Sequence, residues 1–125
     1  MSARRGTGGK PAAFGIGPDE FRRLALALPD AVEGAHMGHA DFRVRKRIFA
    51  TLGSPDAHWG MVKLAPEQQE LFMRVDAAFV PAKGAWGRQG YTLVRLDAVR
   101  ADLLHDALTA AWRTIAQGTK ARGPR

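Results

Sequence analysis

Two short segments of the chain carry residue types that bind phosphate groups and aromatic bases. The first is a basic run, in which Arg43, Arg45, Lys46 and Arg47 place four cations within five residues. The second segment, residues 81–90, carries a tryptophan between a lysine and an arginine. Cations neutralise phosphates and a tryptophan ring can stack on a base, so both segments have the chemistry of nucleic-acid binding.

Residues 81–90, with the sequence Pro-Ala-Lys-Gly-Ala-Trp-Gly-Arg-Gln-Gly, are expected to form a loop and not a helix. Three glycines and a leading proline favour backbone conformations that a helix does not use. Such a loop would display Trp86, with Lys83 and Arg88 on either side. The ring suits a base between phosphate-binding cations, and it equally suits a hydrophobic slot in the protein itself.

The basic run is predicted to lie at the tip of a β-hairpin. Residues 42–45, 47–52 and 59–64 have the alternating or clustered apolar side chains of strands, and residues 53–56 have the composition of a turn. Four cations at a hairpin tip form either a solvated turn or a basic wing that follows a phosphate backbone. In the second case the Trp86 segment would be the companion wing.

Three helices and one further strand complete the expected elements. Helices are predicted over residues 17–28, 66–76 and 101–118, with Gly118 as the end signal of the last, and a strand is predicted over residues 91–96. Neighbouring strands joined by short turns indicate a mainly antiparallel sheet. We therefore expect an α+β fold with the helices on one face of the sheet.

The alternation along the strands assigns side chains to the two faces of the sheet. The face towards the helices is predicted to carry Val44, Ile48, Ala50, Leu52, Val62 and Leu64. The opposite face is predicted to carry Arg43, Phe49, Thr51, Trp59, Met61 and Lys63. An open face of this mixed character is a binding platform or a dimer interface, unless the Trp86 loop folds over it.

Catalytic and metal-binding patterns are weak in this sequence. Glu33, His36, His39 and Asp41 lie close together, but on one regular strand the two histidines would point to opposite faces, and only a bulge at Gly38 would bring them together. Structural zinc sites often include cysteine, which the chain lacks. No nucleophile elbow, Walker loop or zinc-protease motif is present. We therefore predict no metal, no cofactor, no catalytic residue and no enzymatic activity.

Length and charge indicate one domain, over residues 14–118, between disordered basic tails at residues 1–13 and 119–125. The tails hold six of the seven excess positive charges, which leaves 13 basic and 12 acidic residues in the body. The bulk charge of +7 is therefore no argument for a basic patch. Absence of cysteine fits a reducing cytoplasm, and no apolar run approaches the roughly 20 residues that span a membrane.

Several segments, in order and at fitting spacing, resemble the MmcQ/YjbR family of small bacterial proteins. They are Leu26-Ala27-Leu28-Pro29, Glu33-Gly34, His39-Ala40-Asp41-Phe42-Arg43-Val44, Ile48-Phe49-Ala50-Thr51-Leu52, Lys63-Leu64 with Pro66-Glu67-Gln68-Gln69, and Gly84-Ala85-Trp86-Gly87-Arg88-Gln89-Gly90. The resemblance covers about residues 14–116. It implies a CyaY-like α+β fold related to frataxin, and DNA binding through a double-wing motif.

This chain departs from relatives of that fold at two places. Frataxin-like iron binding would want an acidic first helix, but here Asp19 and Glu20 are followed by Arg22 and Arg23. The family often has Gly-Gly-Lys at the hairpin, where this chain has Arg45-Lys46-Arg47. That change adds charge, which favours a phosphate-binding wing, and argues against a tight glycine turn.

The first hypothesis is a small cytoplasmic, non-enzymatic DNA-binding protein. Its predicted DNA contacts are Arg43, Arg45, Lys46, Arg47, Lys63, Lys83, Trp86 and Arg88. The second hypothesis is a module that binds a protein or a small molecule through the mixed face around Phe49, Trp59 and Met61, with a homodimer as one form of it.

Overall fold

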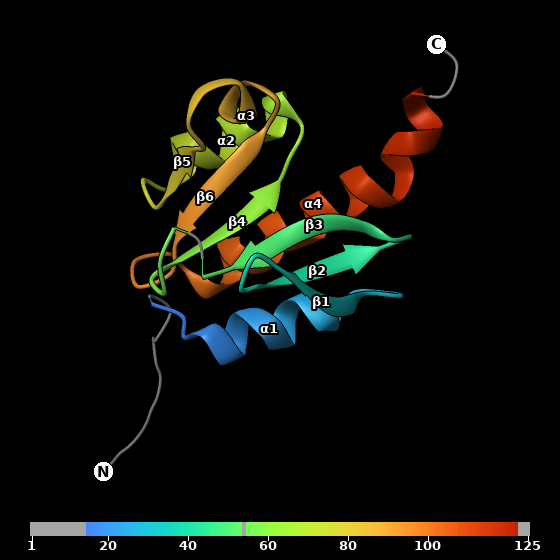
Figure 1. Ribbon diagram of the computed structural model, residues 1–125. Coiled ribbons are helices and arrows are strands. Elements are labelled where there is room, and N and C mark those ends of the chain that lie inside the picture. Colours follow the sequence, from blue (N-terminus) through green and yellow to red (C-terminus); the bar gives the residue numbers. More distant parts are fainter. Residues whose placement is uncertain (1–14, 54, 123–125) are drawn as a thin grey trace.

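The computed structural model describes residues 15–53 and 55–122, and in its last helix the side chains up to Gln117. Figure 1 shows one twisted sheet with a long helix behind it. The six strands lie in the order β1-β2-β3-β4-β6-β5, and each neighbouring pair is antiparallel. Their bounds are β1 Val32–His36, β2 His39–Val44, β3 Arg47–Leu52, β4 Trp59–Lys63, β5 Phe79–Pro81 and β6 Tyr91–Arg95.

The helices are α1 Pro18–Leu26, α2 Pro66–Val75, α3 Gly84–Arg88 and α4 Ala101–Arg122. Helix α4 packs across β3 and β4, and α1 lies beside α4 (Figure 1). Helix α2 packs on β5 and α4. The predicted α+β class, with a mainly antiparallel sheet and its main helices on one face, is confirmed.

The core lies between the sheet and these helices. Phe21 of α1 meets Phe42 of β2 with their ring centroids 5.9 Å apart, and both side chains are fully buried. The predicted stripe of α4 packs there too, with Leu104 and Leu108 fully buried. Burial of these apolar side chains is the main driving force for the layered arrangement.

A β-bulge changes the predicted faces at the start of β3. Phe42 pairs with Ala50, but Arg43 pairs with Ile48, so the register shifts between Phe42 and Arg43. Phe49 therefore turns into the core, where it is fully buried, and Ile48 lies partly exposed on the open face. The predicted faces of these two residues are wrong, because simple alternation does not allow for a bulge.

Residues 32–36, 79–81 and 84–88 form elements that the sequence did not predict. Helix α4 continues past Gly118 to Arg122, so the predicted end signal is wrong and the first part of the predicted C-terminal tail is helical. The predicted tail at residues 1–13 and the last three residues lie outside the described residues. Within the described part of the chain, no helix is both long and apolar enough to cross a membrane.

Candidate nucleic-acid interface

The β2–β3 hairpin carries the basic run at its tip. Val44 pairs with Arg47, so only Arg45 and Lys46 form the connection. Both have left-handed backbone angles, with φ of 54° and 67°. Two-residue hairpin loops with two positive φ angles match the twist of the strands, and they normally use Asn-Gly or Gly-Gly. The turn contains no glycine, as the Arg45-Lys46-Arg47 sequence indicated, and it is nevertheless tight.

The sheet opens next to this hairpin, because β3 extends beyond the end of β4. The ladder between them begins at Ala50 and Val62, which leaves the start of β3 unpaired with β4. A hollow of about 350 Å³ lies here, lined by Arg43, Lys46, Arg47, Ile48, Lys63, Tyr91 and Ile115. We call it the basic hollow. Four of the predicted contacts, from three strands and the hairpin tip, therefore converge on one concave site.

Lys63 lies on the side of the basic hollow opposite the hairpin. Its ammonium group donates hydrogen bonds to the carbonyl oxygens of Gln89, at 2.8 Å, and Leu64, at 3.3 Å. It also lies 4.9 Å from the centre of the Tyr91 ring. These contacts fix the cation at the junction of β4 and β6, where its position favours an anion in the hollow.

Arg43 has a partner that the sequence analysis did not assign to it. Its guanidinium donates two hydrogen bonds to the Asp41 carboxylate, at 2.6 and 2.9 Å, and His36 Nδ1 lies 2.7 Å from the same carboxylate. Asp41 is fully buried. Hydrogen bonding to Arg43, and then to His36, holds the pKa of Asp41 below its usual value despite burial. Arg43 thus balances a buried charge as well as lining the basic hollow.

The two histidines near this carboxylate also differ from the prediction. Met37 and Gly38 form a hairpin turn, so His36 and His39 are cross-strand partners on one face. A single regular strand through both residues was the wrong assumption. Across residues 15–53 and 55–122, no group of three His, Cys, Asp or Glu side chains has the arrangement of a metal site.

The Trp86 segment forms one helical turn, α3, which corrects the prediction of a loop without helix. Close backbone packing explains its glycines. A Cβ atom at Gly87 would overlap the carbonyl oxygen of Ala82, and one at Gly90 would overlap that of Leu64. These two glycines therefore serve the fold.

Gln69 of α2 holds this segment from the core side, a role that sequence reasoning missed. Its amide nitrogen lies 3.1 Å from the Gly87 carbonyl oxygen, 3.2 Å from that of Tyr91 and 3.1 Å from Thr92 Oγ1. The side chain is buried. Its neighbours Glu67, Gln68 and Glu70 are all polar, so residue type alone does not distinguish Gln69 as the buried side chain of this stretch.

Trp86 is 62 % exposed, and its ring meets Tyr91 edge to face with centroids 4.9 Å apart. It is therefore not a buried plug. Tyr91 lies between Trp86 and Lys63, so these three side chains are continuous with the basic hollow. The other predicted contacts lie apart from that hollow: Arg45, Lys83 and Arg88 are exposed and line none of it.

The arrangement is that of a small α+β domain with one antiparallel sheet, and it occurs in known proteins. The chain is similar to a solved structure from Deinococcus radiodurans with a DUF419 domain, with a TM-score of 0.64 and 19 % identity over 90 % of this chain and 83 % of that one. No curated protein matches. The YjbR family model matches residues 26–114, and the chain belongs to the YjbR family, as the sequence resemblance indicated.

Proposed function

We propose that this protein binds DNA, without enzymatic activity, by placing phosphates in the basic hollow. The observation that carries the proposal is the convergence of Lys46, Arg47 and Lys63 on one concave surface. A concave cationic site bounded by protein concentrates the local positive potential more than scattered surface charges do. Outside the terminal segments the chain has 13 basic and 12 acidic residues, so these cations lie together because of the fold and not because of an excess of positive charge.

The backbone of the hairpin tip supports the proposal. A left-handed conformation costs a residue with a side chain about 1 kcal/mol or more, and Arg45 and Lys46 both adopt it. Asn-Gly would occupy the same turn without that cost. A strained pair of cations at a projecting tip is understandable if their charge is used there.

Aromatic contacts extend the same surface. The exposed Trp86 ring and the adjoining Tyr91 ring offer faces and edges for an unstacked base beside the phosphate-binding cations. Stacking of this kind typically contributes about 1–3 kcal/mol per base in single-strand binding. We therefore expect single-stranded DNA to bind more tightly than a duplex of equal length, with Arg88 as an additional phosphate contact.

The test compares two double variants that lose the same charge. Lys46→Gln with Arg47→Gln removes cations from the basic hollow, and Arg23→Gln with Arg74→Gln removes exposed cations from α1 and α2. Affinity for a fluorescent single-stranded oligonucleotide is measured by anisotropy over a range of salt concentrations. The terminal cations are present in every protein, so their contribution cancels in the comparison.

Loss of two phosphate contacts lowers the slope of log affinity against log salt by about 1.4, which corresponds to roughly 20-fold weaker binding near 0.1 M salt. The control variant keeps the slope of the parent. Equal slopes for the hollow variant and the parent would show that the hollow does not hold phosphates.

A further inference from the structure

The basic hollow lies at a break in the sheet, and this position limits what can enter it. The start of β3 has no partner in β4, because the ladder between these strands begins at Ala50 and Val62. Ile115 of α4 is part of the lining, and α4 lies behind the sheet (Figure 1). The hollow therefore reaches through the break to the helix layer, and α4 closes its inner end.

The lining of the basic hollow is rich in positive charge. Arg43, Lys46, Arg47 and Lys63 place four cations around about 350 Å³, and none of the described residues that line it is acidic. Asp41, which balances Arg43, is not part of the lining. An internal phosphodiester of a strand carries one negative charge, whereas a terminal phosphate monoester carries about 1.5 to 2. The terminal group therefore matches the charge of this site better.

A hollow that is closed at its inner end also favours the end of a strand over its middle. An internal phosphate is esterified on two sides, so both neighbouring nucleotides would have to leave the hollow through its mouth. A terminal phosphate has one ester bond, and only one chain has to leave. Its three unesterified oxygens can accept charge-assisted hydrogen bonds from several cations at once.

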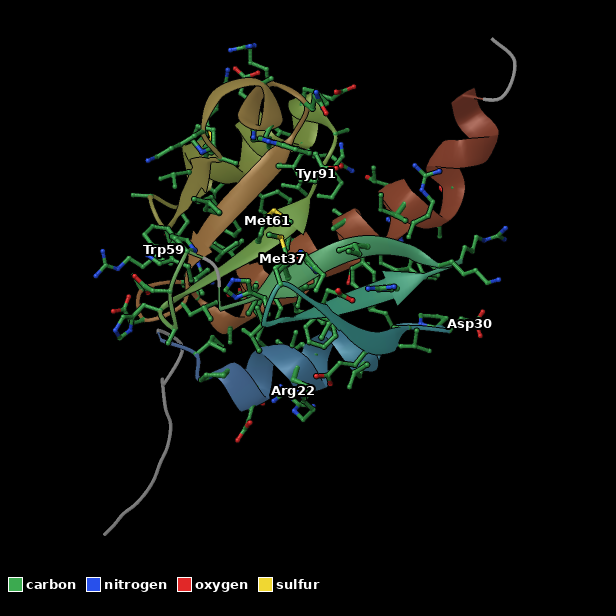
Figure 2. The ribbon with its side chains drawn as sticks, in the orientation of Figure 1. Arg22, Asp30, Met37, Trp59, Met61 and Tyr91 are labelled. Carbon is green, nitrogen blue, oxygen red and sulfur yellow. The ribbon has the colours of Figure 1, made fainter. Side chains whose placement is uncertain are left out.

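Two aromatic rings adjoin the cations of this site. Tyr91, at the start of β6, lines the hollow itself, and Lys63 Nζ lies 4.9 Å from the centre of its ring (Figure 2). The exposed Trp86 ring continues from Tyr91 on the side of α3. A nucleotide whose phosphate lies in the hollow can place its base against these rings, which inorganic phosphate cannot do.

We propose that the basic hollow binds the terminal phosphate of a DNA single strand, so that the protein recognises phosphorylated strand ends. This inference rests on the proposed function, since it names the part of the nucleic acid that the same site holds. Lys46, Arg47 and Lys63 surround the phosphate, and the first base lies against Tyr91 and Trp86.

The first measurement compares short oligothymidylates that carry a phosphate at the 5′ end, a phosphate at the 3′ end, or hydroxyl groups at both ends. Each carries its fluorophore on an internal base, so that both ends are accessible, and binding to the full chain is followed by anisotropy. A terminal phosphate also adds charge, so the matched control is a hydroxyl-ended oligonucleotide that is two nucleotides longer. We expect at least one phosphorylated form to bind about tenfold more tightly than this control. Equal affinities would overturn the inference.

The second measurement repeats the comparison with variants. Lys46→Gln with Arg47→Gln should reduce the advantage of the phosphorylated strand to about twofold or less, and Lys63→Gln, on the opposite side of the hollow, should reduce it as well. Arg23→Gln with Arg74→Gln should keep the full advantage, because neither residue lines the hollow. Melting curves show that each variant is folded. An advantage that stays about tenfold in both hollow variants would place the terminal phosphate elsewhere and overturn the inference.

The outcomes separate this inference from the proposed function. If strands of equal charge bind equally and their affinity still depends on the cations of the hollow, the DNA-binding proposal stands and the strand-end inference fails. If no oligonucleotide binds through the hollow, both fail.

Thymidine 5′-monophosphate tests whether the ligand is a strand end or a free nucleotide. The phosphorylated strand should bind at least about tenfold more tightly, because its further bases and phosphates add contacts outside the hollow. Equal affinity of the mononucleotide would assign the hollow to a free nucleotide and overturn the inference.

Discussion

Replacing Asp41 with alanine removes one buried acceptor from three hydrogen bonds, two donated by Arg43 and one by His36. Breaking a buried ion pair by removing one partner typically costs about 3–5 kcal/mol. The side chain of Arg43 is 34 % exposed, so water can solvate part of the abandoned guanidinium. We therefore expect the lower end, a loss of about 3 kcal/mol in the free energy of unfolding.

Chemical denaturation with urea measures this loss, and thermal unfolding should show a fall of roughly 10–15 °C for a chain of this size. The matched control is Arg74→Gln, which breaks an exposed pair with Glu70 on α2. That change should cost no more than about 0.5 kcal/mol.

The pH dependence of the same proteins tests the cause. The pKa of folded Asp41 is depressed by Arg43 and then by His36, so its contribution is complete above the ordinary aspartate pKa of about 3.9. It is lost as the pH falls through the lower pKa of the folded state. The stability advantage of the parent over Asp41→Asn should therefore shrink below about pH 4. A stability of Asp41→Ala within about 0.5 kcal/mol of the parent would refute the assigned role of this pair.

Three further substitutions test the residues that hold α3, β6 and the β2–β3 hairpin in place beside the basic hollow. Gln69→Leu should lower the free energy of unfolding by about 1 kcal/mol, measured by urea denaturation, because it removes a buried amide donor from α3 and β6 while the backbone oxygens of Gly87 and Tyr91 each keep another partner. Gly90→Ala should cost more than about 2 kcal/mol in the same assay, since its φ is 104° and its Cβ would overlap the Leu64 carbonyl. Arg45→Asn with Lys46→Gly should raise the melting temperature by relieving about 1–2 kcal/mol of backbone strain, and should weaken binding to the oligonucleotide. A stabilised variant that binds as the parent does would argue against use of these cations.

Periodicity predicted the parts of the fold in which each element buries one regular stripe. The long stripe of α4 and the alternation in β4 and β6 are of this kind, and both are present as expected. Alternation did not predict the bulge in the β2–β3 pair, because a bulge depends on how two strands fit together. Ile48 and Phe49 consequently exchange faces.

Sequence reasoning identified the basic residues of the candidate site from local charge, but it did not identify their hydrogen-bond partners. The basic run and Lys63 were found from residue type and strand position. The pairing of Arg43 with Asp41 arises because both project from the same face of β2, and the contact of His36 with Asp41 requires a turn that places β1 beside β2. The role of Gln69 requires α2 to pack beneath α3, which no short segment of sequence reveals.

The most direct test of the DNA-binding proposal is a titration of the isotope-labelled full chain with a short single-stranded oligonucleotide, followed by backbone amide NMR shifts. The proposal predicts that the largest shifts at moderate salt fall on residues 45–48, Lys63 and residues 86–91. These residues surround the basic hollow and the Trp86 ring. Shifts confined to the basic ends of the chain, or absent from the hairpin and Lys63, would contradict it.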